Sequence, residues 1–155
     1  GLVQEISALV SNHEANWEAS HMARLGGRFA GIVQLTASSD AARSLQQALE
    51  GLSGLKVIVD SDGGSETPCG DEIWLELVGS DRHGIISEIS SALARRGVTV
   101  LELSSEVSAA PMGGGNLFKM QASLCCPSSL DRKELQNSLE DLANELMVDI
   151  HLGTP

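Results

Sequence analysis

The sequence predicts an α+β fold in which one small unit is built twice in tandem. Residues 72–152 have the pattern of a strand, a helix, two strands, a helix and a strand, and residues 1–60 repeat this order from the helix onward. The opening GLVQEIS also aligns with GIISEIS at residues 84–90, at a shift of 83 residues. Two amphipathic helices can resemble each other by chance, but the matched order of the later elements favours a duplication.

Apolar periodicity places each element of the second half. Ile73, Leu75 and Leu77 alternate within EIWLELVG, which predicts a strand. After the turn SDRHG, Ile and Leu recur at helical spacing, with Asp81 as the candidate N-cap and Gly97 as the candidate stop. The expected elements are a strand at 72–79, a helix at 85–97, strands at 98–108 and 117–126 around a Gly-rich loop at 109–116, a helix at 127–146 and a strand at 147–152. This order is the ferredoxin-like βαββαβ unit, an antiparallel four-stranded sheet with two helices on one face.

The first half follows the same order but begins at the helix. Its expected elements are a helix at 1–13, strands at 15–25 and 28–37 around a tight turn at Gly26 and Gly27, a helix at 38–54 and a strand at 55–60. The polar, Gly-rich segment 61–71 predicts a linker between domains at 1–60 and 72–155. The first strand is central in this fold, so without it the third and fourth strands lose a neighbour. We therefore expect that the polypeptide extends upstream of Gly1, or that another chain supplies the strand.

The charge balance limits the classes of partner. The net charge is −11 and is spread over both halves, a field that repels DNA, RNA and anionic membranes. No apolar run is long enough to span a membrane, and no signal peptide is visible. We therefore expect a cytoplasmic protein with no direct nucleic-acid partner and no membrane partner.

The side chains that usually carry chemistry form no recognisable constellation. Cys69 stands alone, Cys125 and Cys126 are adjacent, and no CxxC spacing occurs, so we expect buried small side chains, with neither a disulfide framework nor a zinc site. The four histidines are scattered, and no nucleophile lies near a base. The sequence therefore predicts no catalytic residue, no metal and no cofactor.

One motif could hold a ligand: a strand, the turn GSDRHGI and a helix. A helix N-terminus carries unpaired backbone N–H groups and a partial positive charge, so a carboxylate or phosphate could sit against Gly84, Ile85 and Ile86. Asp81 could bind an ammonium group or simply cap the helix. A turn with no ligand, in which Asp81 only caps and Gly84 only turns, explains the same residues.

The same motif carries a resemblance. The run DRHGI followed by ISSALARRGVTVLELSSEV resembles an ACT domain, with His83 where the family usually has proline. The first half, including the RLGGRFAGIV hairpin, is similar to the tandem-ACT repressors of the glycine cleavage system. The likeness covers nearly the whole chain.

The resemblance implies a binding site where ACT domains pair side by side. The loop at 81–86 of one domain would face the second strand of its neighbour, at about 16–20, and an amino acid would lie between them. The candidate ligand contacts are Asp81, Arg82, His83, Gly84, Ile85 and Ile86, the matching Gly1 and Leu2, and Asn16 and Glu18 on the facing strand.

These observations favour a non-enzymatic regulatory protein. The resemblance implies a repressor that responds to an amino acid such as glycine and contacts a transcriptional activator, in a chain that forms homo-oligomers. An alternative is the regulatory ACT segment of an enzyme such as formyltetrahydrofolate deformylase. A third class is an acylphosphatase-like hydrolase that uses Arg82, but no water-orienting amide is identifiable near that arginine.

Overall fold

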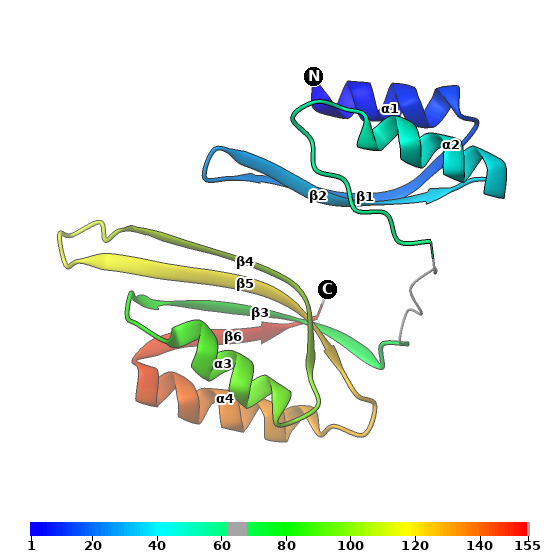
Figure 1. Cartoon of the computed structure of the whole chain (residues 1–155). Coiled ribbons are helices and arrows are strands. Elements are labelled where there is room, and N and C mark those ends of the chain that lie inside the picture. The colour runs from blue at the N-terminus through cyan, green and yellow to red at the C-terminus, as the bar shows by residue number, and fades with distance from the viewer. Residues whose placement is uncertain (62–67, 155) are drawn as a thin grey trace. The chain divides into compact units, whose positions relative to one another are not determined.

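A computed structural model describes residues 1–61 and 68–154 of the chain (Figure 1). The chain divides into two compact units, Gly1–Gly64 and Ser65–Pro155. The predicted linker at 61–71 falls mostly on residues outside the described ranges, and its last residue already begins a strand.

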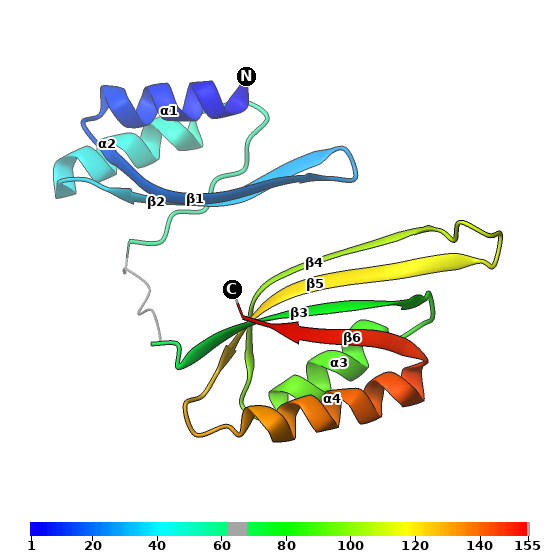
Figure 2. The ribbon, with the colours of Figure 1, turned by 180° about the vertical axis from the view of Figure 1, so that it is seen from behind.

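The second unit has the predicted βαββαβ order. Its elements are β3 (Asp71–Ser80), α3 (Ile85–Ala94), β4 (Thr99–Ala109), β5 (Asn116–Cys126), α4 (Arg132–Leu146) and β6 (Val148–Gly153). The strands form one antiparallel sheet in the order β4-β5-β3-β6, so β3 is central and β4 and β6 are edges. Both helices lie on one face of this sheet, as the two opposite views show (Figures 1 and 2).

Strand alternation produces the core of this unit. Ile73, Leu75 and Leu77 all point toward the helices and are at most 1% exposed. They pack in one cluster with Leu135 and Leu139 of α4 and with the apolar side chains of α3. Each such side chain removes apolar surface from water, which contributes about 1.5–3 kcal/mol per residue.

The first unit contains α1 (Leu2–Asn12), β1 (Asn16–Leu25), β2 (Arg28–Thr36) and α2 (Ser39–Glu50). β1 and β2 form the predicted hairpin, and Gly26 and Gly27 adopt φ values of +56° and +75°, which a two-residue turn needs and glycine permits. Both helices cover one face of the hairpin (Figures 1 and 2). The fully buried core is small: Val10, Ala15, Leu45 and Leu49.

The predicted strand at 55–60 does not form. In the second unit the matching strand, β6, pairs only with the central strand β3. The described part of the first unit has no strand in the place that β3 occupies in the second, so segment 55–60 has no neighbouring strand with which to form backbone hydrogen bonds. Val57 still packs against the small core, but the side chain of Ile58 is 84% exposed. The four-stranded sheet predicted for the second domain is therefore present, whereas the first unit has two of the three strands that were predicted for it.

The predicted cap of α3 is also wrong. Gly84, not Asp81, occupies the N-cap position, with φ +90° and no side-chain hydrogen bond to the helix. The chain remains in the turn for three residues after Asp81, so that carboxylate is too early to cap. At the other end, α3 stops at Ala94, and Gly97 takes the left-handed φ of +71° in the turn that follows.

The cysteine prediction is wrong for two of the three residues. Cys69 and Cys125 form a disulfide with their Cα atoms 5.5 Å apart, although 56 positions separate them in the sequence. Cys126 is a free thiol and is buried as expected. Burial raises the pKa of this thiol, an effect that the nearby Arg132 partly opposes.

Candidate ligand-binding site

A pocket opens where β3 passes into α3. Its volume is about 480 Å³. Its lining is Asp81, Arg82, His83, Gly84, Ile85, Ile86, Ser87 and Phe118. The structure therefore brings all six predicted loop residues to one place and adds Ser87 and Phe118, which the sequence did not single out.

Backbone hydrogen bonds fix the shape of the loop. The N–H of Asp81 donates to the carbonyl oxygen of Asn116 at 2.8 Å, which holds the start of the loop against β5. The N–H of Glu88 donates to the carbonyl oxygen of Gly84 at 3.0 Å and closes the first helical turn. The N–H groups at the start of α3 precede any acceptor within the helix, so they are available to an anion.

An ion pair lies beside these amides. Nη2 of Arg82 is 3.2 Å from Oε1 of Glu88, and the two side chains are 41% and 43% exposed. Glu88 lies one turn into α3, and Oε1 of Glu88 is close to Gly84. Arg82 thus lines the pocket, and its guanidinium forms an ion pair with a carboxylate of the same chain.

Apolar side chains support the loop from below. Ile85 is 2% exposed and Phe118, on β5, is 7% exposed, and both belong to the core cluster of the second unit. Gly79 lies opposite Phe118 in the β3–β5 pairing, and a Cβ there would collide with the side chain of Val148. The pocket therefore combines a buried apolar base with the polar groups of the loop.

The other four predicted contacts lie in the first unit. Gly1 is the N-cap of α1, its amino group donates to Oε1 of Gln4 at 3.4 Å, and Leu2 is the first helical residue. Asn16 begins β1. Glu18, also on β1, accepts a hydrogen bond from Oγ1 of Thr36 at 2.7 Å, so its carboxylate is held within its own hairpin.

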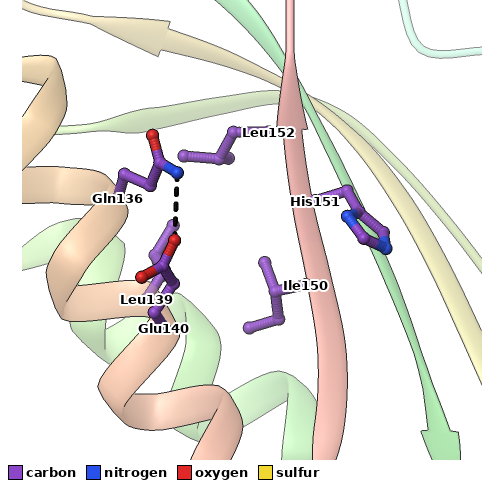
Figure 3. A pocket seen from close by; sticks show the side chains of 6 residues that line it. All are labelled: Gln136, Leu139, Glu140, Ile150, His151 and Leu152. Atoms are coloured by element: carbon purple, nitrogen blue, oxygen red, sulfur yellow. Dashed lines mark hydrogen bonds between the residues drawn. The ribbon is translucent and has the colours of Figure 1, made fainter.

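A second, smaller pocket of about 150 Å³ lies between α4 and β6 (Figure 3). Nε2 of Gln136 donates to Oε1 of Glu140 at 2.9 Å above an apolar base formed by Leu139, Ile150 and Leu152. His151 points away to the other side of β6 (Figure 3). None of the predicted site residues lines this pocket.

Residues 1–61 and 68–154 contain neither a metal-binding cluster nor a membrane-spanning helix. No group of three or more His, Cys, Asp or Glu side chains there is placed to hold a metal ion. No helix in those ranges is long and apolar enough to cross a membrane.

Known proteins share both the sequence pattern and the fold. The ACT domain family matches residues 1–59. The crystal structure of an unknown protein from Galdieria sulphuraria is similar at 33% identity with a TM-score of 0.88, covering 99% of this chain and 89% of that chain. A structure described as a candidate glycine cleavage system transcriptional repressor has 17% identity and a TM-score of 0.73, covering 99% of this chain and 88% of that one.

Other comparisons are more limited. A formyltetrahydrofolate deformylase from Pseudomonas putida is 16% identical with a TM-score of 0.47, and the likeness covers 55% of this chain and only 29% of the enzyme. Among curated proteins none matches. The family match to the first unit and the full-length structural likeness show that this chain belongs to the ACT domain family, and its second unit has the ferredoxin-like topology.

Proposed function

We propose that this chain is a non-enzymatic regulatory protein that binds a small amino acid at the loop 81–86 and controls transcription through contact with another protein. The observation that carries the proposal is the pocket at the start of α3, where free helix amides, a guanidinium and an acidic side chain meet over an apolar base. The full-length likeness in fold to a candidate glycine cleavage system repressor supports the regulatory part.

The proposed ligand is a zwitterion. Its α-carboxylate would accept hydrogen bonds from the amides of Gly84, Ile85 and Ile86 and from the guanidinium of Arg82. Its α-ammonium group would lie near the carboxylate of Asp81. The exposed His83 would border the site.

The ligand's side chain would lie against Phe118. Phe118 belongs to the packed core of the second unit, and we propose a small amino acid such as glycine or serine as the ligand. We further propose that Gly1, Leu2, Asn16 and Glu18 contribute where two ACT domains pair, and that such pairing makes the protein a homo-oligomer in the cytoplasm.

The acidic charge favours a protein partner over DNA. With a net charge of −11, the chain would be repelled by a nucleic-acid backbone, whereas a DNA-binding activator with a basic surface would be attracted. A gel-shift assay with the purified chain alone checks this point. Tight binding to DNA fragments at physiological salt would contradict the proposal.

Calorimetry against a panel of amino acids tests the ligand site, beginning with glycine and serine. We expect one of the small amino acids to bind to the parent chain and to lose at least about tenfold in affinity in Gly84→Val, because the branched side chain is strained at φ +90° and covers the amides. Gly153→Ala is the matched control, since a Cβ there meets nothing within 4 Å. Equal binding by Gly84→Val and the parent would rule out this pocket, provided that a melting curve shows the variant to be folded.

A further inference from the structure

We propose that the Cys69–Cys125 disulfide is a reversible redox site, opened by a glutathione-class thiol, and that its opening releases the first residues of β3. Cys69 is exposed and lies two residues before the start of β3, whereas Cys125 is half-buried near the end of β5. The proposal does not depend on amino-acid binding, because the ligand loop follows the opposite end of β3.

The disulfide holds the less supported end of the central strand. The β3–β5 ladder runs from Asp71 to Ser80, but the pairing of β3 with β6 begins only at Trp74. Asp71 and Glu72 therefore have a neighbouring strand on one side alone. Such a strand end opens easily unless another contact holds it.

Two other contacts accompany the disulfide at this end. Oγ of Ser123, which is 3% exposed, donates to Oε1 of Glu72 at 2.7 Å. Gly70 lies so close to the chain after β5 that a Cβ there would be 2.6 Å from the carbonyl oxygen of Cys126 and 2.7 Å from the backbone N of Ser128. The disulfide links the residue before Gly70 to β5 and so adds a covalent tie to these two contacts.

Exposure decides which sulfur reacts. The thiolate of a reduced glutathione attacks Sγ of Cys69, the S–S bond breaks, and the sulfur of Cys125 leaves as a thiolate and takes up a proton. A second glutathione thiolate then attacks the mixed disulfide, which yields the free Cys69 thiol and oxidised glutathione. The protein disulfide is reduced by two electrons and two glutathione thiols are oxidised, so the exchange runs in reverse when oxidised glutathione is in excess.

Cys126 is not an alternative partner in this exchange. Adjacent strand residues point to opposite faces of a sheet, so its sulfur is directed away from Cys125 and toward the core. It is 6% exposed, and burial raises its pKa, which keeps it protonated and weakly nucleophilic. The exchange therefore runs between Cys69, Cys125 and the external thiol.

Alkylation under native conditions tests the chemistry. The full chain is equilibrated with reduced or oxidised glutathione in excess, trapped with iodoacetamide and weighed by mass spectrometry. We expect alkylation of Cys69 and Cys125 after reduction, neither after oxidation, and alkylation of Cys126 only after unfolding. A bond that never forms in oxidised glutathione, or that stays closed in the native chain under excess reduced glutathione, would overturn the proposal.

Hydrogen exchange tests the structural consequence. We expect the amides of Asp71, Glu72 and Ile73 to exchange at least about tenfold faster in the reduced chain, with no change at the loop 81–86. Cys69→Ser should show the fast exchange in both buffers, and Cys126→Ala should still respond to glutathione like the parent. Identical exchange of the oxidised and reduced chains at the start of β3 would also reject the proposal.

Discussion

Arg82 and Glu88 form an ion pair across the first turn of α3, with Nη2 of the arginine 3.2 Å from Oε1 of the glutamate. The carboxylate of Glu88 thus lies where the carboxylate of a bound amino acid would approach Arg82. Both side chains are about two-fifths exposed, so the pair itself adds little to stability. In the proposed mode of binding, the carboxylate of the ligand would compete with Glu88 for this guanidinium.

Glu88→Gln should therefore tighten the binding of an amino acid. Removing the internal negative charge frees the guanidinium, and we expect the affinity for the ligand identified by calorimetry to rise severalfold, or about 1 kcal/mol. The melting temperature should change little, because the pair is exposed. Glu140→Gln is the matched control, since Glu140 is also an exposed helical carboxylate that accepts from a side chain four residues away. Unchanged or weaker binding in Glu88→Gln would show that Arg82 does not receive the ligand.

Gly79→Ala should destabilise the second unit. The added methyl group collides with the side chain of Val148 on β6, and overpacking of this kind costs about 1–3 kcal/mol. Urea unfolding of Gly79→Ala, Val148→Ala and the double variant measures the coupling. We expect Gly79→Ala to lower the free energy of unfolding much less when Val148 has been replaced by alanine. Strictly additive changes in the free energy of unfolding would contradict a contact between the two side chains.

Core substitutions should act on one unit at a time. Leu77 is completely buried in the core of the second unit, and Leu45 is 3% exposed in the core of the first. Replacing either by alanine should cost about 2–5 kcal/mol in its own unit. Hydrogen exchange measured by mass spectrometry should show faster exchange in α3 and β5 for Leu77→Ala and in α1 and α2 for Leu45→Ala. Faster exchange in both units from one substitution would argue against a domain boundary at 61–71.

The segment 55–60 should tolerate charge. Ile58 is 84% exposed and its segment forms no ladder, so Ile58→Asp should change the free energy of unfolding by less than about 0.5 kcal/mol. Ile150, on β6, packs against the main core, and Ile150→Asp should cost more than about 2 kcal/mol. Similar costs for the two variants, measured by urea unfolding, would show that segment 55–60 is structured like β6.

The helices and strands of the second unit could be predicted almost entirely from sequence, because each of them pairs or packs with other elements of the same unit. The alternation of Ile73, Leu75 and Leu77 and the helical spacing of the leucines in α4 both match buried faces in the structure. Segment 55–60 has the composition of a strand, but a strand also needs a neighbour, and periodicity does not report whether one is present.

Features that depend on contacts between distant positions were harder to predict. The Cys69–Cys125 bond joins residues 56 positions apart, and their proximity follows from the β3–β5 register rather than from any cysteine spacing. The six loop residues at 81–86 were found because they are contiguous. Phe118 was missed as a lining residue because β5 brings it to the loop from elsewhere in the chain.

The open edge of β2, which segment 55–60 does not cover, affects how the protein should be handled. β2 pairs only with β1 among the described strands, so the hairpin keeps a row of backbone donors and acceptors to which a foreign extended peptide can add. The apolar side chains of Ile58 and Val59 lie in contact with solvent and would favour such an encounter. Long-range repulsion between copies, set by the net charge of −11, opposes it, so high salt or a pH near 4.6 should promote aggregation that starts from the first unit.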